Sequence, residues 1–165
     1  MQKFVIALTV FISIVLESAF FPFLSMNGVV PNITMILVIC YALYQAEDQA
    51  ALIGLLAGLV KDVAVGRIIG VSAITFMMLG YLTSHYKHKI FAEHATTPLI
   101  IVLFGTFFHE SVYMLFVFFL GYQVNLIYAA QQVWILQALY NFLMVMPVYF
   151  ALRRLLNWKV MKKQY

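Results

Sequence analysis

Charged residues are scarce in this chain of 165 residues: Asp, Glu, Lys and Arg together make up 10% of it, and six of them are acidic. A soluble domain has about a quarter of its residues charged, so this composition excludes a soluble globular protein and also a disordered chain. Cys40 is the single cysteine, which excludes an intramolecular disulfide and a secreted disulfide scaffold. The basic residues are scattered along an apolar chain rather than gathered on a polar face, which excludes a nucleic-acid-binding protein.

Hydrophobic residues make up 65% of the chain, and its mean hydropathy is +0.98. This composition predicts an all-α, polytopic integral membrane protein with a single transmembrane domain over residues 1–165. Six transmembrane helices are expected at about 4–24, 31–45, 50–65, 68–84, 98–120 and 131–152, with a basic tail at 153–165. Two alternatives remain open: a cleaved signal peptide for the first span, and one long interfacial helix in place of the two short helices of 31–65.

The distribution of Lys and Arg predicts the orientation. If the N-terminus is cytoplasmic, eight of the ten basic residues fall on the inside, and only Lys61 and Arg67 fall in outer loops. Basic residues concentrate in cytoplasmic segments of membrane proteins. Both termini are therefore expected in the cytoplasm.

Five polar residues interrupt the predicted spans at similar depth, about 17–23 Å from the cytoplasmic ends at ~1.5 Å per residue. They are Glu17, His109, Glu110, Gln137 and Asn141. Because lipid cannot satisfy such groups, they are expected to face protein or a water-filled cavity. Three interpretations stay open: a cavity that binds a ligand or a partner helix, an interhelical hydrogen-bond cluster that holds the bundle together, and a proton relay.

Small residues and one acid follow in the next spans. Gly54 and Gly58 form a GxxxG pair, which allows close helix approach, either within the protein's own bundle or toward a partner. Asp62 is expected to accept hydrogen bonds from loop N–H groups, to cap the next helix, or to pair with Arg67, and contact with a ligand stays open as the alternative. Pro31 suits the first turn of the second span.

Motifs for catalysis and metal binding are missing. The chain has no G-x-S-x-G, H-E-x-x-H or Walker sequence, so neither an enzyme nor a cofactor is indicated. Histidines cluster only in the inner loop, as His85, His88 and His94. We interpret that loop as solvated and basic, close to the headgroups of membrane lipids, and predict no metal site.

The run Gly54-Leu55-Leu56-Ala57-Gly58-Leu59-Val60-Lys61-Asp62 resembles the signature of the rod shape-determining protein MreD family. In that family a G-x-x-x-G-L-x-x-D segment leads into a glycine-containing turn and a further helix. The matching residues here are Gly54, Gly58, Leu59, Asp62, Gly66 and Gly70. Pro31 matches the proline of a family Pro-Asp-Leu sequence, whereas Asn32 replaces its acid.

The resemblance implies a non-enzymatic component of the elongation machinery in the bacterial cytoplasmic membrane. Its implied partner is the bitopic protein MreC, and through MreC it links MreB filaments to RodA and its class B penicillin-binding protein. The implied fold is similar to the substrate-binding subunits of energy-coupling-factor vitamin transporters, and such a subunit is the alternative function. Self-association and the helix face that contacts MreC stay open.

Overall fold

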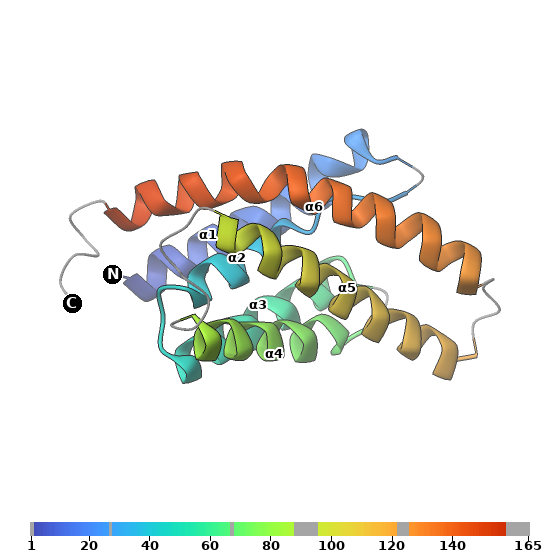
Figure 1. Ribbon diagram of the computed structural model, residues 1–165, viewed down its shortest axis with the longest axis horizontal. Coiled ribbons are helices and arrows are strands. Elements are labelled where there is room, and N and C mark those ends of the chain that lie inside the picture. Colours follow the sequence, from blue (N-terminus) through green and yellow to red (C-terminus); the bar gives the residue numbers. More distant parts are fainter. Residues whose placement is uncertain (1, 27, 67, 88–95, 122–125, 158–165) are drawn as a thin grey trace.

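The computed structural model describes residues 2–26, 28–66, 68–87, 96–121 and 126–157 (Figure 1). All the secondary-structure elements in these ranges are helices, which confirms the predicted all-α fold. The one β-type pairing in these ranges is an isolated bridge between Met26 and Val29. The elements are α1 (Gln2–Ala19), the 3-10 helix η1 (Phe21–Leu24), α2 (Ile33–Ala42), α3 (Glu47–Ala64), α4 (Val71–Tyr86), α5 (Thr96–Phe119) and α6 (Leu126–Asn157).

Three of these helices are long and apolar enough to cross a membrane. The candidate spans are Phe4–Phe23, Thr97–Phe119 and Val133–Leu155, and α2 is a shorter apolar helix. A helix of 23 residues is about 35 Å long, which exceeds the ~30 Å hydrocarbon core. Large apolar side chains such as Phe4, Phe104 and Ile135 are mostly exposed, as lipid-facing residues are. The chain is therefore a membrane protein.

Helix α2 is the centre of the molecule. All ten of its residues are buried, and it contacts α1, α3, α4, α5 and α6. A helix that is apolar all round is stable only when other elements surround it, and the sequence ITMILVICYA has this character. The other helices thus form a shell around α2 (Figure 1).

Local chemistry sets the helix ends. The segment 31–65 forms two helices, because Leu43–Ala46 breaks the path between α2 and α3. Helix α2 begins at Ile33, since the side chain of Asn32 accepts a hydrogen bond from the Met35 N–H (3.1 Å) and acts as its N-cap. Pro31 thus precedes the cap and does not occupy the first turn, contrary to the sequence-based expectation.

The first and third helices also differ in their ends from the expected ranges. Helix α1 ends at Ala19 and is followed by η1, because Pro22 has no N–H to continue an α-helix. Helix α3 begins at Glu47 instead of Ala50. Glu47 and Asp48 occupy its first turn, where carboxylates interact favourably with the helix dipole.

The glycines of α3 bring it into close contact with α4. A Cβ on Gly54 or Gly58 would overlap the backbone carbonyls of Phe76 and Ser72 in α4, and a Cβ on Gly80 of α4 would overlap the Ala50 carbonyl of α3. The GxxxG pair therefore mediates packing within the protein's own bundle. Its glycines are buried and do not form a face for a partner.

Helices α5 and α6 run antiparallel and extend past the end of the α3–α4 hairpin that contains the 66–70 turn (Figure 1). Residues of α5 are buried at several positions up to His109, and none from 110 to 121 is buried. Within residues 133–155 of α6, the buried positions are Gln137, Asn141, Val145, Tyr149 and Leu152. The end of α5 from residue 110 onward is thus covered by few other residues of the described chain.

Candidate functional site

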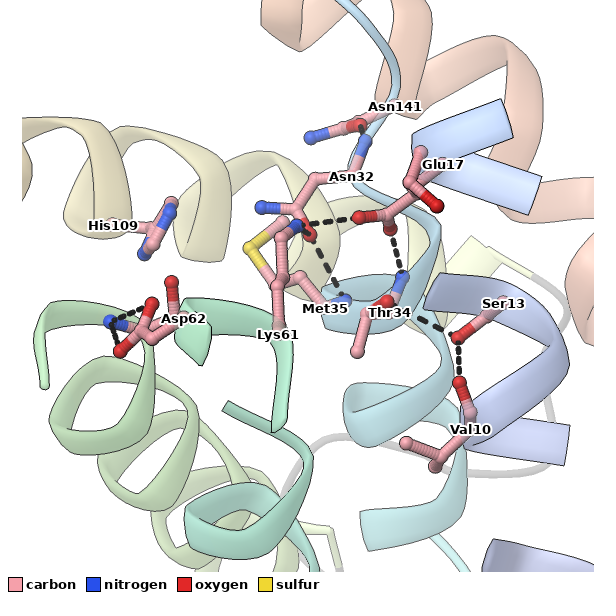
Figure 2. Close-up of polar contacts among 12 residues, drawn as sticks. Val10, Ser13, Glu17, Asn32, Thr34, Met35, Lys61, Asp62, His109 and Asn141 are labelled. Atoms are coloured by element: carbon pink, nitrogen blue, oxygen red, sulfur yellow. Dashed lines mark hydrogen bonds and ion pairs between the residues drawn. The ribbon is translucent and has the colours of Figure 1, made fainter. Parts of the chain in front are cut away.

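A buried ion pair joins the end of α1 to the end of α3. The Lys61 ammonium lies 2.7 Å from Glu17 Oε2, and their side chains are 13% and 2% exposed (Figure 2). The other carboxylate oxygen of Glu17 accepts a hydrogen bond from the Thr34 N–H in the first turn of α2. Both oxygens are therefore satisfied, as a carboxylate away from water requires.

Lys61 makes further contacts that hold it in the interior. Its ammonium donates to Asn32 Oδ1 at 2.6 Å and lies 5.5 Å from the centre of the Phe76 ring of α4. A cation over an aromatic face is attracted by the ring quadrupole, more strongly when it is desolvated. Lys61 thus connects α1, the start of α2, and α4, and is not the loop cation that its position in the sequence predicts.

Asn141 extends this network to the two long helices. Its Oδ1 accepts a hydrogen bond from the Asn32 N–H at 2.8 Å, and its Nδ2 donates to Thr106 Oγ1 of α5 at 2.9 Å. Asn141 is fully buried. Together with the ion pair, these bonds connect the backbone at the start of α2 with α1, α3, α5 and α6. Figure 2 shows the contacts among Glu17, Asn32, Lys61 and Asn141.

Asp62, next to Lys61, points the other way and caps α4. Its carboxylate accepts hydrogen bonds from the N–H groups of Gly70 (2.8 Å), Ser72 (3.1 Å) and Ala73 (3.2 Å). Gly70 has a φ of +101°, a conformation that favours glycine. Of the roles predicted for Asp62, the structure has the cap and the loop N–H contacts, and pairing with Arg67 lies outside the described residues.

The remaining signature residues differ in their surroundings. Gly66 follows α3, where its N–H donates to the Asp62 carbonyl (3.1 Å), and a Cβ there would lie 2.7 Å from the Asp62 backbone. Leu59 is 38% exposed on the outer side of α3. The signature therefore combines helix contact at Gly54 and Gly58 with turn geometry after Asp62.

The five predicted intramembrane polar residues do not form one cluster. Glu17 and Asn141 belong to the network around Lys61 and Asn32. His109 pairs separately with Thr75 of α4, with 2.8 Å between its Nδ1 and the hydroxyl oxygen. Glu110 is half-buried and Gln137 is 7% exposed, and within the described ranges neither side chain has a hydrogen bond.

Sequence reasoning missed the residues that complete these contacts, namely Lys61, Asn32, Thr34, Thr75 and Thr106. One signal was available: Lys61 follows an apolar helical run and directly precedes the signature acid. Asn32 stands where the family sequence has an acid, and it accepts a hydrogen bond from Lys61.

The chemistry of these groups is structural in character. The side-chain oxygens of Glu17, Asp62 and Asn141 each bind a donor group of the protein itself, so none of these side chains is available to a reacting substrate. Across the described ranges no three His, Cys, Asp or Glu side chains are placed to hold a metal ion. In the predicted inner loop, His85 pairs with Glu47 (3.1 Å), and His88 and His94 lie outside the described residues.

Comparison with known proteins identifies the family. The model of the family described as rod shape-determining protein MreD matches residues 1–159 of the chain. No curated protein and no solved structure matches it. Since the match covers almost the whole length, the chain belongs to the rod shape-determining protein MreD family.

Proposed function

We propose that this protein is a non-enzymatic membrane scaffold that binds MreC and thereby helps control lateral peptidoglycan synthesis. The family match over residues 1–159 carries this proposal, because membership of the family points to a role in rod shape determination. Through MreC the scaffold connects MreB filaments with RodA and its class B penicillin-binding protein. It needs no cofactor for this role.

The arrangement in the membrane is part of the proposal. The protein resides in the bacterial cytoplasmic membrane as one multi-pass domain of six spans, in which α2, α3 and α4 add to the three long apolar helices. Both termini are cytoplasmic. The excess of Lys and Arg in the inner segments supports this orientation.

The internal contacts support a scaffold more than a carrier or an enzyme. Glu17, Lys61, Asn32 and Asn141 are engaged with one another or with the backbone, which rigidifies the bundle and leaves these groups bonded. A rigid bundle suits a protein that positions others. The family match gives no support to the alternative of an energy-coupling-factor substrate-binding subunit.

Depletion of the protein in its host tests the proposal. Rod-shaped cells are expected to become spherical, and expression of the wild-type chain from a plasmid is expected to restore the rods. Retention of rod shape after depletion, in a host without a second copy of the gene, would contradict the proposed function.

A further inference from the structure

Two polar side chains in the middle of α5 and α6 differ from their neighbours in having no hydrogen-bond partner within the described residues: Glu110 and Gln137. The polar residues one turn closer to the cytoplasmic end, Thr106 and Asn141, bind each other at 2.9 Å. A charged or amide group left unpaired inside a bilayer is costly and marks a functional site by default. The contrast leaves both side chains free to bind a group from outside the described part of the chain.

Helix geometry places these two residues side by side. Glu110 follows Thr106 by four residues on α5, and Gln137 precedes Asn141 by four residues on α6. Residues four apart lie on the same side of a helix, one turn of about 5.4 Å from each other. Because α5 and α6 are antiparallel, both steps lead in the same direction, toward the loop between the helices (Figure 1).

A third polar group lies on the next turn of α6. The indole Nε1 of Trp134, three residues before Gln137, is buried and has no hydrogen-bond partner among the residues that the structure describes. The Trp134 ring packs edge-on against Phe107 of α5, with 6.2 Å between the ring centres. This level is also where burial of α5 stops, since no residue from 110 to 121 is buried. Half-buried Glu110 therefore lies where the burial of α5 ends, and Gln137 and the Trp134 Nε1 are buried close to that level of the helix pair.

We propose that Glu110 and Gln137 form a hydrogen-bonding site for a polar side chain of a partner's membrane-spanning helix, which packs along the exposed end of α5. The partner side chain is a donor, such as a hydroxyl, an amide or a basic group, because the carboxylate of Glu110 only accepts when ionised. Glu110 is half-buried, so a side chain arriving from the lipid side reaches it. This inference rests on the proposed function, in which that helix belongs to MreC.

Variants at the two positions separate a docking role from an internal structural one. Glu110→Leu and Gln137→Leu are each expected to weaken capture of MreC by the detergent-solubilised full-length protein about 3- to 20-fold, the range of single interhelical hydrogen bonds in membranes. The melting temperature of the free variants is expected to stay at the wild-type value or rise, because no internal bond is lost. Glu110→Gln, which keeps an acceptor oxygen, is expected to retain most of the capture.

A photo-crosslinking pair locates the surface. p-Benzoyl-phenylalanine in place of Phe116, on the open end of α5, is expected to crosslink to MreC. The same amino acid in place of Phe11, which is exposed on α1, is the matched control and is expected to give no MreC adduct.

Three outcomes would overturn the inference. One is that stable Glu110→Leu and Gln137→Leu variants capture MreC as well as the wild-type protein does. If cells that carry these variants nevertheless lose their rod shape, the two residues bind a small ligand instead. Another is a lower melting temperature of both variants with unchanged capture, which would indicate an internal role. The third is crosslinking at Phe116 to a second copy of the chain instead of MreC. Failure of the wild-type protein to capture MreC would instead contradict the proposed function itself.

Discussion

Replacing Lys61 by methionine tests the buried network at its centre. The substitution keeps the length of the side chain and its packing against Phe76 but removes the charge that lies 2.7 Å from Glu17 Oε2. The Glu17 carboxylate then keeps only the Thr34 N–H among its described partners. Removing one member of a buried ion pair costs about 3–5 kcal/mol, because the remaining charge is left uncompensated.

The size of this effect depends on Glu17 being charged and buried. If so, Glu17→Leu combined with Lys61→Met is expected to cost less than Lys61→Met alone, since the double variant has no buried charge left at this position. Glu17→Leu alone is expected to be costly for the converse reason, as it leaves the Lys61 ammonium with Asn32 Oδ1 and the Phe76 ring. The coupling free energy of the pair is expected to be at least about 2 kcal/mol.

The assay is a double-mutant cycle on the free energy of unfolding, measured by denaturant titration of the protein in mixed micelles. The control is Leu56→Ala on the exposed side of α3, which is expected to change stability little. If the losses in free energy of unfolding of the two single variants simply add up to the loss of the double variant, the assignment of a buried, mutually dependent pair is refuted.

Further predictions concern the contacts around this network. Gly58→Leu is expected to separate α3 from α4 and to prevent accumulation of folded protein, measured by size-exclusion chromatography of the solubilised chain, whereas exposed Leu56→Gly is expected to fold. Asp62→Ala is expected to lower the free energy of unfolding by about 1–3 kcal/mol, because the cap of α4 is lost. Asp62→Asn is expected to lower it by less, since the amide keeps one acceptor oxygen. Equal losses in the two variants would argue against the cap. Asn141→Leu is expected to cost about 1–3 kcal/mol, because it removes two hydrogen bonds to other elements, and Thr106→Val less, because it removes one; unchanged thermal stability of Asn141→Leu would contradict this role.

Composition was sufficient to predict the helical class and the membrane, because lipid requires apolar residues and satisfied backbones whatever the tertiary structure. The role of Asp62 as a helix cap was also predictable, since a cap depends on local sequence. The ends of α1 and α3 were less predictable. The end of α1 is set by Pro22, and the start of α3 by the acidic pair Glu47 and Asp48. These local effects are about as large as the hydrophobic signal at a helix end, so the hydrophobic pattern alone does not fix the last residue of a helix.

The arrangement of the polar residues could not be read from the sequence. Glu17, Glu110 and Asn141 lie at similar depth along their helices, but depth says nothing about rotation around the bundle or about which helices are neighbours. Lys61 illustrates the point, because its partner Glu17 is 44 residues away in sequence and their contact depends on how α1 and α3 both pack against α2. Lys61 was assigned to an outer loop because it is charged and lies near the outer end of the third predicted span.

The most direct test of the proposed scaffold function is the mass of the complex that the tagged, full-length protein forms with MreC in native membranes, measured after mild extraction. The account predicts a stable complex that contains MreC, that survives Glu110→Gln, and that is weakened about 3- to 20-fold in Glu110→Leu while the variant itself stays folded. A monodisperse wild-type protein that is free of MreC in the same extract would contradict the account.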